Sequence, residues 1–163
     1  MSPDCRHLVV DGHSVLFSLP QLAAPHAPAS RAARRALIHA LQRFQDFSGI
    51  GVSVAFDGRG GAGEFRAPGT LEIRYAGSHQ TADAIIEKSV ASHPRPSELV
   101  VVSGDIQERT TVEALGAKTL SPEGLLDWMR DACPPGPPEG PRTPAHGTKK
   151  IAVDTLRTTP LNT

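Results

Sequence analysis

The stretch HLVVDGHSVLF, residues 7–17, gives the strongest indication of the fold. The apolar run Leu8, Val9 and Val10 is typical of a buried strand, and it ends abruptly at Asp11. A glycine, a histidine and a serine follow before the chain becomes apolar again. A carboxylate at the end of a core strand either caps the next turn or belongs to a functional site.

The segments that follow alternate between strand and helix patterns. Ser30 is the expected N-cap of the first helix. Further strands are predicted at 51–57, 70–76, 98–105 and 117–120, and helices at 30–47, 81–93, 106–116 and 121–132. Such alternation predicts βαβ units. We therefore expect an α/β fold, a Rossmann-like three-layer α/β/α sandwich with a mostly parallel sheet of about five strands.

The composition is that of one globular domain with a tail. The chain has 163 residues, and 39% of them are hydrophobic, which is enough for a core. From residue 134 the sequence PPGPPEGPRTPAHGTKK is too rich in proline and glycine to form a packed element. We expect a folded domain over 1–133 and a flexible tail over 134–163. In that tail, a short docking segment near 151–156 is the alternative to plain disorder.

The net charge and the cysteine content limit the binding partners and the cellular location to be expected. The net charge is zero, so no whole-chain basic field indicates nucleic acid, although a local patch can still bind it. Cys5 and Cys133 show no spacing typical of a zinc site or a disulfide framework. No segment has the length and apolarity of a membrane span, and the first residues lack a signal-peptide pattern. We expect a cytoplasmic protein with no membrane partner, and the oligomeric state stays open.

Four aspartates are predicted to reach one edge of the sheet. Asp11, Asp57 and Asp105 follow predicted strands, Asp83 lies near the start of a predicted helix, and Glu87 shares its helix face. Ligands of open parallel sheets bind at the carboxyl ends of the strands. Clustered carboxylates repel each other unless a cation such as Mg²⁺ or Mn²⁺ neutralises them. Phosphodiester hydrolysis fits such a site. Taken singly, each aspartate could instead cap a turn or a helix.

The loop GRGGAG, residues 58–63, matches the G-x-G-x-x-G pattern of dinucleotide-binding proteins. That fingerprint must follow the first strand and open a helix, whereas this loop follows the second predicted strand and leads into a third. We therefore expect a flexible loop and no nucleotide cofactor. Arg59 in this loop remains a candidate for a phosphate contact.

Four motifs occur in order along the chain, VVDGHSVLF, SVAFDG, TADAIIEKSV and VVVSGDIQER, and the helix ARRALIHALQRFQDFSG lies between the first two. Together, over residues 7–132, they resemble the YacP-like branch of the NYN domains, which are relatives of the PIN-domain nucleases. The resemblance implies a PIN-like α/β/α fold and RNA cleavage that depends on Mg²⁺ or Mn²⁺. Some members of this branch are ribosome-associated endoribonucleases.

The resemblance also implies roles for individual acidic residues. Asp11, Asp83 and Asp105 match the catalytic residues that bind the metal. Asp57 matches the acidic end of the second strand and would support the site. Glu87 has no such match and would support the site only because it shares a helix face with Asp83.

Substrate contacts are predicted for hydroxyl and basic side chains. Thr81 and Ser103 match hydroxyl positions that orient water or phosphate. Arg34 and Arg35 on the first long helix could contact the RNA backbone, or they could form a solvated face. The usual family motif DGYN is DGHS here, so that Ser14 replaces an asparagine in the substrate-binding region.

We expect a metal-dependent endoribonuclease that acts on single-stranded RNA, with the ribosome or mRNA as a further partner. The alternative is an RNA- or ribosome-binding module with little or no catalytic activity. The neutral charge and the DGHS departure favour it slightly, whereas the clustered carboxylates argue against it. A different phosphohydrolase on a Rossmann-like fold is disfavoured, because His13 stands where a D-x-D motif needs its second aspartate.

Overall fold

A five-stranded sheet forms the centre of the protein. The computed structural model describes residues 4–58 and 71–133. All strand pairs are parallel, and the strand order is β3-β2-β1-β4-β5. The strands are β1 (His7–Asp11), β2 (Gly51–Phe56), β3 (Glu72–Tyr75), β4 (Leu99–Val102) and β5 (Lys118–Leu120). The predicted sheet is confirmed, and it is entirely parallel.

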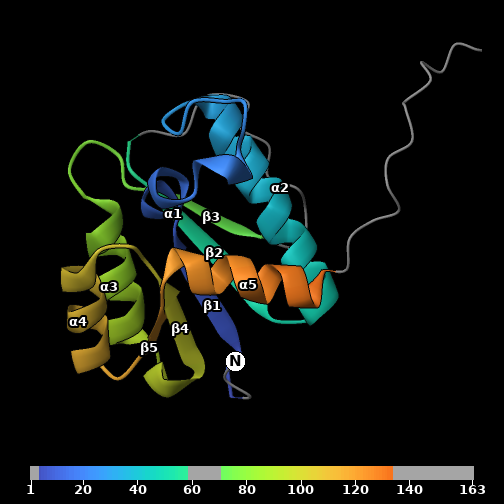
Figure 1. Ribbon diagram of the computed structural model, residues 1–163. Helices are drawn as coiled ribbons and strands as arrows, with labels where there is room; N and C mark the ends of the chain where they lie inside the picture. Colours follow the sequence, from blue (N-terminus) through green and yellow to red (C-terminus); the bar gives the residue numbers. More distant parts are fainter. Residues whose placement is uncertain (1–3, 59–70, 134–163) are drawn as a thin grey trace, which may run out of the picture.

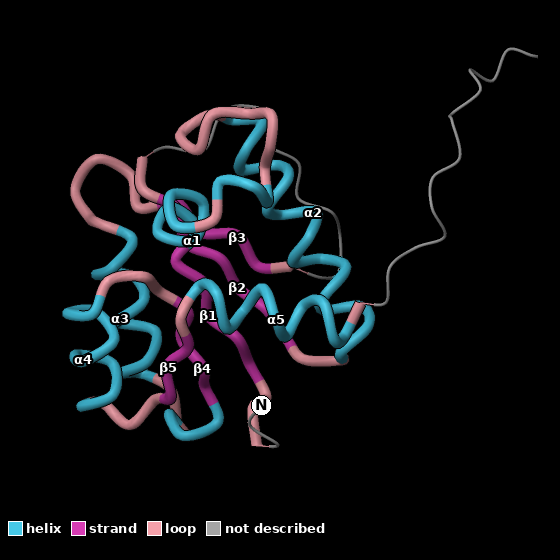
Figure 2. The backbone as a smooth tube through the Cα atoms, viewed as in Figure 1, coloured by secondary structure: helices cyan, strands magenta, loops and turns pink. Residues whose placement is uncertain are grey.

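Helices cover both faces of this sheet. They are α1 (Gly12–Ser18), α2 (Arg31–Ser48), α3 (Ala82–Ser92), α4 (Ile106–Ala114) and α5 (Pro122–Ala132), with short 3₁₀ turns at Pro20–Leu22 and Pro96–Glu98. Figure 1 shows α2 and α5 on one side of the sheet and α3 and α4 on the other. The tube in Figure 2 shows how strands and helices alternate along the chain. The predicted three-layer α/β/α sandwich is therefore confirmed.

The first strand explains why the sheet is buried on both faces. Leu8 and Val10 belong to the core beneath α1, α2 and α5, whereas Val9 belongs to the smaller core beneath α3 and α4. Successive strand residues point to opposite faces, so a central strand covered on both sides needs an unbroken apolar run. The run that opens the sequence is the consequence of this central position.

Helix boundaries follow the capping residues in the sequence. The hydroxyl of Ser30 accepts a hydrogen bond from the Ala33 amide at 3.0 Å, as predicted for the start of α2. Ser121 caps α5 in the same way, with Pro122 at the first helical position. The predicted strand 98–105 is shorter than expected, because β4 ends at Val102 and the chain turns there into the N-cap of α4.

The order of the strands determines where a ligand can bind. After β1 the chain adds β2 and β3 outward on one side, and it then crosses through α3 to β4 on the other side of β1. The carboxyl ends of β1 and β4 therefore flank the point where the strand order reverses, which is where open α/β sheets form their clefts.

Some predicted features lie outside the described residues. They are Arg59 with most of the glycine loop, and the predicted tail over 134–163 with its docking segment. Within the described ranges, no helix combines the length and the apolar character needed to cross a membrane.

Candidate metal site

Three carboxylates converge at the reversal of the strand order. Asp11 is the last residue of β1, Asp83 lies in the first turn of α3, and Glu108 lies in the first turn of α4. One oxygen atom from each side chain lies within 4.8 Å of the corresponding atoms of the other two. The structure thus brings together two of the predicted acids, Asp11 and Asp83, with a third that the sequence interpretation did not include.

Asp11 has two roles: it is the N-cap of α1, and it is a member of this acidic group. Its Oδ1 accepts a hydrogen bond from the Ser14 amide at 3.1 Å and so starts α1, a helix that was not predicted. The residue is only 5% exposed. Burial raises the pKa of the Asp11 carboxyl above its usual value, and the negative charges of Asp83 and Asp57 raise it further. The two alternatives for Asp11, a cap and a site residue, are therefore compatible.

Glu108 is the most unusual member of the group. It is 3% exposed, and no donor lies at hydrogen-bonding geometry to Oε1 or Oε2 among the described residues, although the Ser103 hydroxyl and the Asp11 carboxyl lie close enough to affect its pKa. Burial raises the pKa of its carboxyl from 4.5 to about 8, and the charges of Asp11 and Asp83 also raise it. A buried carboxylate costs folding free energy unless it keeps a proton or a cation compensates its charge. The donor set, three carboxylates with unused oxygens, fits a hard divalent cation such as Mg²⁺ or Mn²⁺.

Asp83 lies at the more open side of the group and is half-buried. Burial raises the pKa of its carboxyl, and the charges of Asp105 and Asp57 raise it as well. Asp57 and Asp105 are thus close enough to add negative potential to the site, although they are not among the three converging residues.

These two aspartates and Thr81 hold the helices that carry the group. Oδ1 of Asp57 accepts a hydrogen bond from the Ala82 amide at 2.8 Å, and Thr81 caps α3 through the Ala84 amide at 3.1 Å. Oδ1 of Asp105 accepts from the amides of Gln107 at 2.8 Å and Glu108 at 3.4 Å and so caps α4. The caps therefore orient the first turns from which Asp83 and Glu108 project.

Two serines join the loops that follow β1 and β4. Ser14 Oγ accepts a hydrogen bond from the Gly104 amide at 2.6 Å, and the Ser103 hydroxyl lies 3.5 Å from Ser14 Oγ. Ser103 Oγ also accepts from the Asp105 amide at 3.0 Å. A Cβ on Gly104 would lie 2.7 Å from Ser18 Oγ and 3.0 Å from Ser14 Oγ, so a larger residue there would displace these hydroxyls. The hydroxyls of Ser14 and Ser103, which are two of the three predicted to contact substrate, thus have contacts within the protein.

The other predicted residues lie around this centre. Glu87, one turn beyond Asp83 on α3, is half-buried and is not part of the three-residue group. Arg34 is half-buried and Arg35 is exposed on α2, which covers the opposite face of the sheet from α3 and α4. Arg59 lies outside the described residues.

Glu108 could have been noticed in the sequence as part of a different pattern. It stands three residues after the N-cap Asp105, which is the third helical position, where a glutamate often completes a capping box. That pattern predicts a carboxylate turned back to the helix start and exposed to solvent. The structure shows a buried carboxylate beside Asp11 instead.

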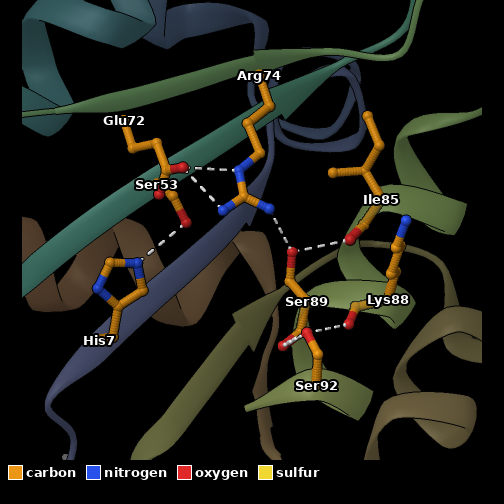
Figure 3. A network of polar contacts seen from close by, with 8 residues as sticks. All are labelled: His7, Ser53, Glu72, Arg74, Ile85, Lys88, Ser89 and Ser92. Atoms are coloured by element: carbon orange, nitrogen blue, oxygen red, sulfur yellow. Dashed lines mark hydrogen bonds and ion pairs between the residues drawn. The ribbon is translucent and has the colours of Figure 1, made fainter.

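A second polar cluster lies nearer the amino ends of the strands, and Figure 3 shows that it is internally paired. His7 Nε2 lies 3.0 Å from Ser53 Oγ. Arg74 pairs with Glu72 at 2.7 Å and donates to Ser89 Oγ at 2.6 Å. Burial lowers the pKa of the His7 imidazole. The polar groups of this cluster form hydrogen bonds and ion pairs with one another, and the contact between Arg74 and Ser89 joins α3 to the sheet. The cluster therefore differs from Glu108, whose carboxylate oxygens have no such partner among the described residues.

Comparisons with known proteins identify the family of the chain. The model of the YacP-like NYN domain matches residues 8–134. The protein YacP of Bacillus subtilis, which is described as uncharacterized, is 29% identical over 122 residues, covering 73% of this chain and 72% of that protein. The crystal structure of Rae1 (YacP) from Bacillus subtilis superimposes with a TM-score of 0.66 at 27% identity, covering 77% of this chain and 74% of the other. The structure of its W164L mutant gives a TM-score of 0.65 at the same identity. The chain therefore belongs to the family of YacP-like NYN domains.

Proposed function

We propose that this protein is a metal-dependent endoribonuclease that hydrolyses phosphodiester bonds of RNA. Asp11, Asp83 and Glu108 would hold Mg²⁺ or Mn²⁺ at the carboxyl ends of β1 and β4. The observation that carries the proposal is the buried Glu108 carboxylate, which has no hydrogen-bond partner among the described residues and lies in a group with two other acids. Membership of the NYN family, relatives of the PIN-domain nucleases, supports a nucleic-acid substrate.

A cation explains the arrangement better than a purely structural role does. Three carboxylates within 4.8 Å repel one another, and burial of two of them makes the repulsion more costly. A divalent ion at this position would supply charge neutralisation at the phosphate and Lewis-acid activation of water. The caps formed by Asp57 and Asp105 hold the ligand-bearing turns in place before the ion binds.

The remaining assignments are parts of the same proposal. Asp105 would add a ligand beside Asp83, whose pKa its charge already raises. Asp57 and Glu87 would act as supporting acids, directly or through water. Thr81, Ser103 and Ser14 would position water or phosphate at the edge, and Arg34 and Arg35 would attract the RNA backbone. Single-stranded RNA, on the ribosome or in mRNA, would be the substrate.

The test is cleavage of a labelled single-stranded RNA in Mn²⁺ or Mg²⁺ by the purified protein and its variants. The wild type is expected to cut the RNA and to leave 3′-hydroxyl ends, and EDTA abolishes the reaction. Asp11→Asn and Glu108→Gln are expected to lower the rate by about a hundredfold or more, since each removes a metal ligand. Asp131→Asn is the matched control, because Asp131 is an exposed acid in the last turn of α5, away from the carboxyl ends of the strands.

The variants also separate this proposal from the alternative. A wild type that binds RNA but shows no cleavage in either metal would indicate a binding module of the YacP-like fold. Equal cleavage by wild type and Glu108→Gln would remove Glu108 from the site. Calorimetry with Mn²⁺ alone checks the ligand assignment without reference to any substrate. Co-sedimentation with purified ribosomes tests the ribosome as a partner.

A further inference from the structure

His13 and Phe17 form an exposed aromatic pair on α1. Their ring centroids are 4.5 Å apart, and the ring planes are inclined by 37°. Phe17 is 53% exposed, and His13 is exposed as well. The opposite side of the same helix is firmly anchored, because Val15 and Leu16 are buried in the core. The pair therefore presents aromatic faces to solvent from a rigid support.

The pair lies beside the acidic group. Asp11 is the N-cap of α1, so Phe17 is six residues from an acid of the site, or about 9 Å at 1.5 Å per residue along the helix. The loop that leads to Glu108 packs on this helix too, since the Gly104 amide donates to Ser14 Oγ at 2.6 Å. The aromatic pair and the acids are thus held in one fixed arrangement.

We infer that His13 and Phe17 form a stacking surface for an unpaired RNA base next to the bond to be cleaved. This inference rests on the proposed function. If a phosphate of single-stranded RNA binds at Asp11, the nucleotides next to that phosphate come within reach of the short helix α1. Every base has a face that can stack on an aromatic ring, and base stacking on aromatic residues is a common way of holding single strands. Bases within a duplex are already stacked on their neighbours, so this surface selects single-stranded RNA.

Nucleic acid is favoured over a protein partner by the position of the pair. An exposed aromatic pair far from the acids would be an equally good protein contact. Here the helix that carries the pair starts at a residue of the site itself, so a nucleic-acid strand bound at the acids would lie next to the pair. The aromatic faces supply the base contact that the converging acids cannot supply.

The experiment measures stacking without turnover. The wild type with Ca²⁺ in place of Mn²⁺ serves as the background, because Ca²⁺ occupies carboxylate sites and is expected not to support cleavage, and the probe is a single-stranded RNA that carries one 2-aminopurine. Binding to this background is expected to change the 2-aminopurine fluorescence. Adding Phe17→Ala is expected to weaken binding by roughly 5- to 150-fold and to abolish the fluorescence change. Phe17→Trp is expected to restore both.

Phe47→Ala is the matched control. Phe47 is 57% exposed and lies in the last turn of α2. This turn is next to the amino end of β2, whereas the acids lie at the carboxyl ends of the strands. Equal affinity and equal fluorescence change for Phe17→Ala and Phe47→Ala would overturn the inference, as would equal binding of duplex and single-stranded probes. Thermal unfolding of each variant confirms folding, which substitutions of these exposed side chains leave intact. If Phe17→Ala behaves as wild type while Asp11→Asn abolishes cleavage, the stacking surface is wrong and the nuclease proposal stands. If no protein cleaves RNA, the binding measurement still decides the stacking surface.

Discussion

Replacing Glu108 by glutamine is predicted to stabilise the metal-free protein and to remove its stabilisation by metal. Glutamine keeps the shape of the side chain and removes its charge. In the folded protein the pKa of Glu108 rises from 4.5 to about 8, so the folded state keeps a proton that the unfolded state releases. The contribution of Glu108 to stability therefore falls as pH rises above about 4.5, and it is fully lost above about pH 8.

The magnitude follows from this rise in pKa. A change from 4.5 to about 8 is about 3.5 units, and at about 1.4 kcal/mol per unit the upper limit is about 5 kcal/mol. The open edge beside half-buried Asp83 admits water, which screens the charge and reduces this figure. We expect Glu108→Gln to raise the free energy of unfolding in EDTA by about 2–3 kcal/mol more at about pH 8.5 than at about pH 4.5.

Metal reverses this comparison. An ion that binds only the folded state adds about 2.7 kcal/mol at a concentration of one hundred times its Kd. The wild type is expected to gain this stabilisation in Mn²⁺, and Glu108→Gln is expected to gain little of it. The variant is thus more stable than the wild type in EDTA and loses that advantage in Mn²⁺.

Urea unfolding followed by tryptophan fluorescence measures both effects. Trp128 is the only tryptophan, and it packs edge-on against Phe44 in the core at 5.2 Å between ring centroids, so its emission reports global unfolding. Glu123→Gln, an exposed charge change on α5, controls for the loss of one negative charge. A stability difference between Glu108→Gln and wild type that does not change with pH would refute the reasoning. Equal stabilisation of both proteins by Mn²⁺ would refute the assignment of Glu108 as a ligand.

Three further predictions follow from the same geometry. Mn²⁺ binding must displace the proton of Glu108, so calorimetry should show a Kd that falls by up to about tenfold per pH unit below about pH 8 and levels off above it; a Kd independent of pH would contradict this. Asp105→Asn keeps an N-cap and should leave the free energy of unfolding unchanged. If Asp105 is a metal ligand, as the sequence predicts, the substitution should weaken Mn²⁺ binding by about tenfold or more. Unchanged Mn²⁺ affinity would mean that Asp105 serves only as the N-cap of α4. Gly12→Ala places a Cβ 2.3 Å from the ring of Phe56 and should lower the free energy of unfolding by about 1–3 kcal/mol in urea titrations, and a neutral result would mean that the ring moves freely.

Much of the fold could be predicted because its signals are local. The sequence of strand β1 contains an unbroken apolar run, and such a run is typical of a strand that is covered on both faces. Ser30 and Ser121 mark the helix starts through their own hydrogen bonds to nearby amides. Helix α1 escaped prediction because its cap, Asp11, and its short apolar stretch continue directly from the strand. The end of β4 was placed too late because Ser103 and Gly104 belong to the loop that meets Ser14, a contact between distant parts of the chain.

The sequence by itself determined the alternation of strands and helices, the central position of β1 and the delivery of Asp11 and Asp83 to one edge, since each depends on the pattern of side chains along one element. Only the tertiary structure decided that Glu108 completes the acidic group. A glutamate in the first turn of a helix can turn to solvent or inward, and its neighbours in the chain are the same in both cases. The packing of α4 beside α3 and against β4 places this carboxylate next to the end of β1, where it is buried without a hydrogen-bond partner among the described residues.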